Sequence, residues 1–197
     1  MNTLARNFLR PVHGPVAAGA DAMRIVGLVS VAVAFLLHEP TDAGILAFTL
    51  PGLMVPRLLA MRPGADLAFG VILLTAAWSN VYDLYTRLPG WDLVVHAAAT
   101  AALTVAAYLL LAHARVVPPA AGPGRSRRAV VVLSPVIGLA ISAVWEMVEW
   151  SGREFVTDTI FVTYTDTIGD MAAGAVGATL AGLLMAVVRV EDRPARH

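Results

Sequence analysis

Six apolar stretches, separated by shorter polar ones, make up most of the chain. Each stretch is close to the roughly 20 residues that a transmembrane helix needs to cross the hydrocarbon core of a bilayer. The pattern predicts an all-α, polytopic membrane helix bundle of about six transmembrane helices, which forms a single integral membrane domain over residues 1–197. The expected spans are residues 22–38, 43–61, 65–84, 91–114, 129–150 and 166–188.

The second expected span, residues 43–61, contains Pro51 and Pro56. A proline inside a helix removes one backbone hydrogen bond and disturbs the preceding turn. Membrane helices tolerate this where neighbouring groups satisfy the freed backbone atoms. We therefore expect this span to be kinked or broken.

Composition agrees with a membrane protein, since 58% of the 197 residues are hydrophobic and only 14% are charged. Such values are unusual for a soluble domain and typical of helical membrane proteins. The chain has no cysteine, which excludes disulfides, thiolate metal sites and cysteine nucleophiles.

The basic residues, all of them arginines, predict the orientation in the membrane. Only Arg87 and Arg153 fall on one side of the expected spans. Because positively charged loops stay in the cytoplasm, we expect cytoplasmic termini and a multi-pass protein of the bacterial inner membrane. Topology explains this arginine distribution without nucleic-acid binding. The arginines on the cytoplasmic side are Arg6, Arg10, Arg24, Arg57, Arg62, Arg115, Arg125, Arg127, Arg128, Arg189, Arg193 and Arg196.

Polar and small residues recur every four positions in four of the stretches. Residues four apart share one face of a helix, and small or hydroxyl residues allow membrane helices to pack closely. We therefore expect these faces to converge and their ionisable residues to meet near the outer surface. The faces consist of Thr75, Ser79 and Asp83; of Asp92, His96, Thr100 and Thr104; of Ser134, Gly138, Ser142 and Glu146, with Glu149 beside them; and of Asp166, Asp170, Gly174, Ala178 and Gly182.

Convergence would surround one imidazole with five carboxylates, which cannot all stay charged and unpaired next to hydrocarbon. They must be protonated, paired with Arg87 or Arg153, or neutralised by a cation. Oxygen ligands with one imidazole suit a divalent Mg, Mn, Zn or Fe ion. The pattern thus predicts a metal site whose ligands are Asp92, His96, Glu149 and Asp170.

Several of these residues also have a simpler interpretation. Asp92 and Asp166 begin helices, where a carboxylate satisfies free backbone N–H groups. A single histidine such as His96 is often a hydrogen-bonded packing residue, and Glu149 could form an ion pair with Arg153 one turn later. Capping does not explain Glu146 or Glu149, because both lie near a helix C-terminus, where a negative charge opposes the helix dipole.

The same residues carry a resemblance to a known family. The pieces Asp92-Leu-Val-Val-His96, Trp145-Glu146-Met-Val-Glu149-Trp150 and Asp166-Thr167-Ile-Gly-Asp170-Met171, followed by Gly177-Ala178, resemble the motifs of the YjdF-like family of uncharacterised bacterial inner-membrane proteins. That family has D-x-x-x-H, E-x-x-E-W and D-T-x-x-D-M…G-A in this order. The order more distantly resembles the VanZ-like proteins, from whose pattern Glu149 and Gly174 depart. The resemblance covers about residues 83–190. It implies the fold of that family but identifies no reaction.

Three functions fit these features. The first is a metal-dependent hydrolase or transferase at the outer membrane–water interface, acting on a lipid-linked or phosphorylated substrate. In it, Glu146 or Asp166 would be the general base, and Arg87 and Arg153 would bind an anionic group. The second is an ion- or proton-coupled transporter that uses the acids and His96 as a relay. The third is a membrane scaffold whose acidic cluster fixes helix register. The sequence leaves the oligomeric state open.

Overall fold

The computed structural model describes residues 3–157 and 160–192, and within these ranges the fold is all-helical. Arg193 and Arg196, which contribute to the predicted orientation, lie outside the described residues. The helices are α1 (Thr3–Phe8), α2 (Pro15–Leu37), α3 (Pro40–Leu58), α4 (Pro63–Val81), α5 (Leu84–Arg87), α6 (Trp91–His113), α7 (Arg127–Phe155) and α8 (Tyr164–Val187).

Five helices of the described residues, α2, α4, α6, α7 and α8, are long and apolar enough to cross a membrane. Their ends lie within about five residues of the predicted spans, except at the start of α2. This helix begins at Pro15 rather than at residue 22, with Gly14 as its N-cap at φ 84°. The added residues are rich in alanine, which favours helices without being strongly hydrophobic. Hydropathy therefore marks this start too late.

α3 occupies the second expected span and is not among these five helices. It remains one helix from Pro40 to Leu58 and includes both Pro51 and Pro56. The helix is therefore not broken, and the other expected outcome, a kink, remains a prediction. The N-terminal end of α3 is stabilised by a capping box of Glu39 and Asp42. In it, each side chain accepts a hydrogen bond from the other residue's backbone N–H.

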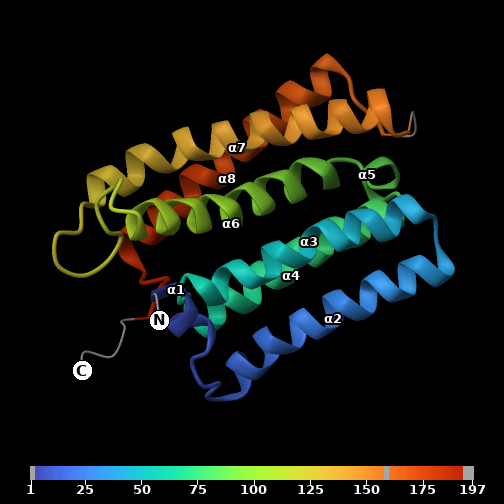
Figure 1. Cartoon of the computed structure of the whole chain (residues 1–197). Coiled ribbons are helices and arrows are strands. Elements are labelled where there is room, and N and C mark those ends of the chain that lie inside the picture. Colours follow the sequence, from blue (N-terminus) through green and yellow to red (C-terminus); the bar gives the residue numbers. More distant parts are fainter. Residues whose placement is uncertain (1–2, 158–159, 193–197) are drawn as a thin grey trace. The chain divides into compact units, whose positions relative to one another are not determined.

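The chain divides into two compact units, residues 1–88 with 189–197, and residues 89–188. In the first unit, α2, α3 and α4 pack against one another, α1 packs on α3, and α5 packs on α4. In the second unit, α6, α7 and α8 pack against one another. Figure 1 shows the helices of each unit running side by side. The single integral domain expected from the sequence remains a prediction.

A network of charged side chains joins the three long helices of the first unit; we call it the Arg24 network. Arg24 of α2 binds Asp66 of α4, with Nη2–Oδ1 and Nη2–Oδ2 distances of 2.8 and 3.0 Å. Arg24 also binds Asp21, three residues earlier, at 2.9 Å. Arg57 of α3 binds the same Asp21 at 3.1 Å. Two guanidinium groups therefore balance two carboxylates.

The C-terminal described residues complete the first unit. The N–H of Arg62 donates to the carbonyl of Val190, and the N–H of Asp192 donates to the carbonyl of Ala60. Arg10 reaches the Asp192 carboxylate at 3.1 Å. The turn between α3 and α4 is therefore tied to residues that follow the last long helix.

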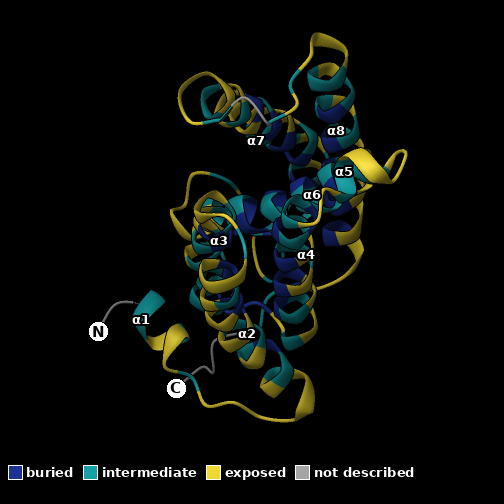
Figure 2. Cartoon of the chain, turned by 90° about the vertical axis from the view of Figure 1, so that its right-hand side faces the viewer, coloured by how far each residue is buried: buried dark blue, intermediate teal, exposed yellow. Residues whose placement is uncertain are grey.

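Small residues let the helices of the second unit approach closely. A Cβ at Gly177 of α8 would collide with the backbone carbonyl of Ala97 on α6, and one at Gly174 would collide with the Ser142 hydroxyl of α7. Figure 2 shows buried residues in each of these helices. On α7 they recur every four positions, as the spacing predicts: Val130, Ser134, Gly138, Ser142 and Glu146. α8 is thus held tightly between its two neighbours, α6 and α7.

Candidate metal site in the second unit

His96 of α6 lies at the centre of a group of carboxylates from all three helices of the second unit. Its Nε2 is 3.3 Å from Asp92 Oδ1 and 4.0 Å from Asp170 Oδ2. Its Nδ1 is 3.8 Å from Glu146 Oε1. Both ring nitrogens therefore face carboxylates. We call Asp92, His96, Glu146, Glu149 and Asp170 the His96 cluster.

The cluster contains two overlapping sets of donor atoms. Asp92, His96 and Asp170 each offer one donor atom, and these atoms lie within 4.8 Å of one another. His96, Glu146 and Glu149 meet the same condition. Metal–oxygen and metal–nitrogen bonds are about 2.0–2.6 Å long. Two donor atoms that bind the same ion are therefore at most about 5 Å apart. Either set thus fits a divalent cation.

Two carboxylates of the cluster are buried, and burying them costs free energy unless a cation or a hydrogen-bond donor contacts them. The side chains of Asp170 and Glu146 are only 2% and 8% exposed. Asp170 Oδ1 and Glu146 Oε1 are both buried and receive no hydrogen bond from the described residues. A buried carboxylate oxygen without a donor destabilises the fold, and more so when it is charged. These two atoms are therefore suited to a cation.

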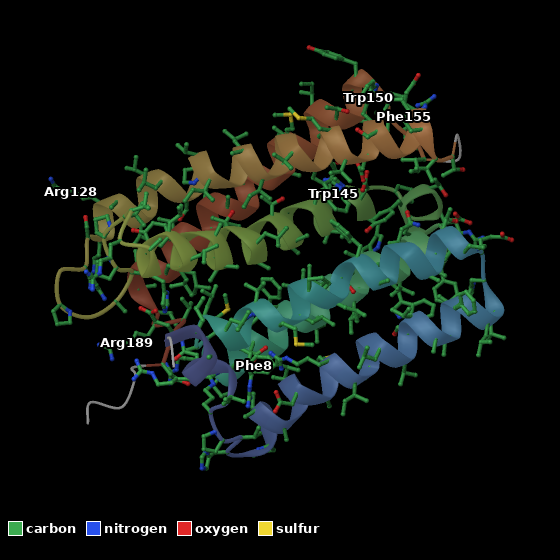
Figure 3. The ribbon with its side chains drawn as sticks, in the orientation of Figure 1. Phe8, Arg128, Trp145, Trp150, Phe155 and Arg189 are labelled. Atoms are coloured by element: carbon green, nitrogen blue, oxygen red, sulfur yellow. The ribbon has the colours of Figure 1, made fainter. Side chains whose placement is uncertain are left out.

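Local sequence explains how each helix delivers its residues. Asp92 and His96 lie four apart, one turn of α6 from each other, and Glu146 and Glu149 lie three apart near the C-terminal end of α7. Gly90 begins α6 in the left-handed conformation, at φ 75°, which glycine adopts without strain. Figure 3 shows Trp145 and Trp150 on the stretch of α7 that carries the two glutamates.

The close packing continues inward from the cluster. Thr100 of α6 and Ser142 of α7 lie next, with their hydroxyl oxygens 3.4 Å apart. Thr104 follows one turn further along α6; it is fully buried, and its hydroxyl has no hydrogen-bond partner among the described residues. A Cβ at Gly138 of α7 would collide with Ala178 of α8 at this level. The site is therefore closed on its inner side by packed side chains.

Three further residues that the sequence suggested for the site, Asp166, Arg153 and Arg87, do not belong to the His96 cluster. The N–H of Asp166 donates to the hydroxyl of Thr163, so Thr163 is the residue whose side chain caps α8. Asp166 lies in the first turn of that helix, where a carboxylate complements the helix dipole. Arg153 donates to the carbonyl of Val162. Arg87 lies in the first unit and pairs with Asp83 at 3.5 Å, with both side chains 66% exposed. The role of Asp166 as general base and the roles of Arg87 and Arg153 in substrate binding remain predictions.

The Arg24 network was not expected from the sequence, where Arg24 served only as a topology signal. Arg24 and Asp66 each lie within a long apolar helix. An ionisable residue in such a stretch usually faces a partner inside the bundle. That signal was present at both positions, but only the fold shows that α2 and α4 bring the two residues together.

The fold and the composition define this chain as a polytopic α-helical membrane protein. Residues 22–191 match the family described as predicted membrane protein (DUF2238), and the chain belongs to that family. This is the YjdF-like family expected from the motifs, whereas the more distant VanZ-like resemblance remains a prediction. A search of curated proteins found no match, and a search of solved structures found none either.

Proposed function

We propose that the His96 cluster binds a divalent metal ion and forms the site of a metal-dependent hydrolase or transferase. The observation that carries this proposal is the meeting of three donor atoms within 4.8 Å, from Asp92, His96 and Asp170. Two buried oxygens, Asp170 Oδ1 and Glu146 Oε1, receive no hydrogen bond from the described residues, which supports it. The donor chemistry, mostly oxygen with one imidazole, suits Mg, Mn, Zn or Fe(II).

The proposed ligands are Asp92, His96, Glu149 and Asp170. A bound divalent ion supplies Lewis acidity toward a phosphoryl or carbonyl oxygen. Glu146, which faces His96 Nδ1, or the more accessible Asp166 would take the proton from the attacking water or hydroxyl. The attacking oxygen then bonds to phosphorus or carbon, and the bond to the leaving group breaks.

A lipid-linked or phosphorylated substrate fits the surroundings of the cluster. Trp150 and Phe155, on the same end of α7 as the two glutamates, are 52% and 75% exposed, and Figure 3 labels both. Exposed aromatic side chains at a helix end favour the membrane–water interface. Arg153, at the same end of α7, would provide positive charge for an anionic group, and the same role for Arg87, in the first unit, stays a prediction from the sequence. The substrate would thus arrive from the lipid interface.

The topology that we propose has six spans, with α3 as the sixth, and both termini in the cytoplasm of a bacterium. The arginine-rich α6–α7 connection would then be cytoplasmic, and the His96 cluster would lie at the extracytoplasmic face of the inner membrane. α3 packs against the two apolar helices α2 and α4, which supports its inclusion.

Transport is less well supported than catalysis. A transported ion needs a path through the protein, whereas Gly138, Gly174 and Gly177 bring the helices of the second unit into close contact inward of the cluster. A purely structural cluster also fits less well, because paired groups would not leave buried oxygens without donors.

Metal content of the purified, detergent-solubilised protein tests this proposal. We expect near-stoichiometric Mg, Mn, Zn or Fe by elemental mass spectrometry, and its loss in a His96→Ala, Glu149→Ala variant of equal monodispersity. Glu154→Ala is the matched control, since it removes an exposed acid from the same end of α7. Absence of metal from the wild-type protein, even after loading with Mn²⁺, Zn²⁺ or Mg²⁺, would refute the proposed site.

A further inference from the structure

The two units carry charged groups at corresponding places. Each unit has three long helices that all pack against one another, α2, α3 and α4 in the first and α6, α7 and α8 in the second. In each, the charged residues come from the N-terminal half of its first helix, the C-terminal end of its second, and the first two turns of its third. This correspondence follows from positions within each unit alone.

The contacts within the two groups correspond as well. On the first helix, an aspartate lies one turn before a basic residue and contacts it: Asp21 and Arg24 at 2.9 Å, and Asp92 and His96 at 3.3 Å. The same basic residue faces a buried aspartate at the start of the third helix. These pairs are Arg24 with Asp66 at 2.8 Å, and His96 with Asp170 at 4.0 Å.

The second helix marks the difference between the units. α3 contributes the cation Arg57, which binds Asp21 at 3.1 Å, whereas α7 contributes the carboxylates of Glu146 and Glu149. The Arg24 network therefore contains two guanidinium groups and two carboxylates and is neutral. The His96 cluster contains four carboxylates and one imidazole, and two of its buried oxygens have no donor among the described residues. Unbalanced negative charge in such a place must be protonated, paired or neutralised by a cation, and the proposed function takes the last of these.

We propose that the two units are versions of one three-helix arrangement, in which the second unit holds a divalent cation where the first holds the guanidinium groups of Arg24 and Arg57. The presence of the cation depends on the proposed function, whereas the shared arrangement of the two units does not. The first unit thus shows how this arrangement is stabilised without a metal. Arginines placed in the second unit at the corresponding positions, 96 and 149, should satisfy Asp92, Glu146 and Asp170 in the same way.

The test measures the thermal unfolding of the full chain in detergent, with EDTA or with Mn²⁺. At 100 times Kd, Mn²⁺ should raise the Tm of the wild-type protein by roughly 5–10 °C. The variant His96→Arg, Glu149→Arg should melt in EDTA at or above the wild-type Tm, and Mn²⁺ should no longer shift it. Glu154→Arg, a matched change outside the cluster on α7, should respond to Mn²⁺ as the wild type does.

The outcomes separate the two parts of the proposal. If Mn²⁺ stabilises the wild type but the double variant melts well below it in EDTA, the shared arrangement is wrong and the cation site stands. If Mn²⁺, Mg²⁺ and Zn²⁺ all leave the wild-type Tm unchanged, the cation site fails. The double variant in EDTA then decides the arrangement alone, because a Tm at or above wild type supports it and a lower Tm overturns it.

A single change covers the case in which the double variant does not fold. Glu149→Arg replaces one carboxylate by one guanidinium and keeps His96. It should lower Mn²⁺ affinity at least about tenfold without lowering the Tm in EDTA. A Tm in EDTA clearly below that of the wild type would overturn the shared arrangement.

Discussion

Arg24 of α2 binds both carboxylate oxygens of Asp66 of α4, although the two side chains are only 11% and 5% exposed. One guanidinium nitrogen, Nη2, contacts both oxygens, while the other, Nη1, binds Asp21 at 2.9 Å. The several donors of one guanidinium group thus serve two carboxylates at once, which the compact charge of an ammonium group does less well. Burial makes the pair costly to break from one side only, because the remaining charge then lacks a partner. The pair therefore fixes the register of α2 against α4.

Removal of one member of this pair should destabilise the first unit. For Arg24→Ala we expect a loss of about 3–5 kcal/mol in the free energy of unfolding, the usual range for a buried pair broken on one side. Chemical unfolding in detergent measures it, with the exposed Arg6→Ala as control. The double variant Arg24→Ala, Asp66→Ala should lose less than the sum of the single losses; additive losses would show that the pair contributes little.

The contact of Gly177 with Ala97 predicts a strong effect of one methyl group. Gly177→Ala would place a Cβ against the carbonyl of Ala97, a backbone group that moves only with its helix. We expect destabilisation of about 1–3 kcal/mol or more, as for other overpacked sites. Gly64→Ala is the control, since no atom lies within 4 Å of its Cβ. Equal Tm values for the two variants would argue against the close α6–α8 contact.

Thr104 offers the opposite case, a substitution that should stabilise. Its hydroxyl is fully buried without a partner among the described residues, so Thr104→Val removes an unsatisfied polar group of similar volume. We expect a gain of about 1 kcal/mol in stability. Thr179→Val is the matched control on α8, because that hydroxyl donates to the carbonyl of Ala175. A loss of stability at Thr104 would show that its hydroxyl has a partner, such as a buried water molecule.

Asp170 and Asp166 should differ in their effect on metal binding. Asp170 belongs to the donor set with Asp92 and His96 and is 2% exposed, whereas Asp166 lies in the capped first turn of α8. Asp170→Asn should lower Mn²⁺ affinity at least about 100-fold, and Asp166→Asn no more than about tenfold. Isothermal titration with Mn²⁺ measures both. The reverse order would make Asp166 the ligand and Asp170 a packing residue.

The absence of cysteine gives a clean test of the membrane orientation. Single cysteines are placed at exposed Pro123, in the α6–α7 connection, and at exposed Glu154, near the end of α7. A membrane-impermeant maleimide should label Glu154→Cys in intact cells, and Pro123→Cys only after permeabilisation. The wild-type chain is the unlabelled control. Labelling of Pro123→Cys in intact cells would invert the proposed topology.

Hydropathy and four-residue spacing predicted much of the candidate site. They placed Asp92 and His96 on one face of α6, and Glu146 on the same face of α7 as Ser142, because a helix repeats every 3.6 residues whatever surrounds it. The structure brings these residues together, with His96 Nδ1 3.8 Å from Glu146 Oε1. Spacing alone did not distinguish buried Asp170 from Asp166, four residues earlier on α8.

The sequence by itself determined the helices and the faces that they present, since length, hydropathy and small-residue spacing are local properties of the chain. Only the tertiary structure decided which charges meet. Asp66 is separated from Arg24 by 42 residues and an intervening helix, and no local pattern pairs them. The same holds for the balance of charge, because the neutrality of the Arg24 network and the excess of carboxylates around His96 arise only when three helices pack together.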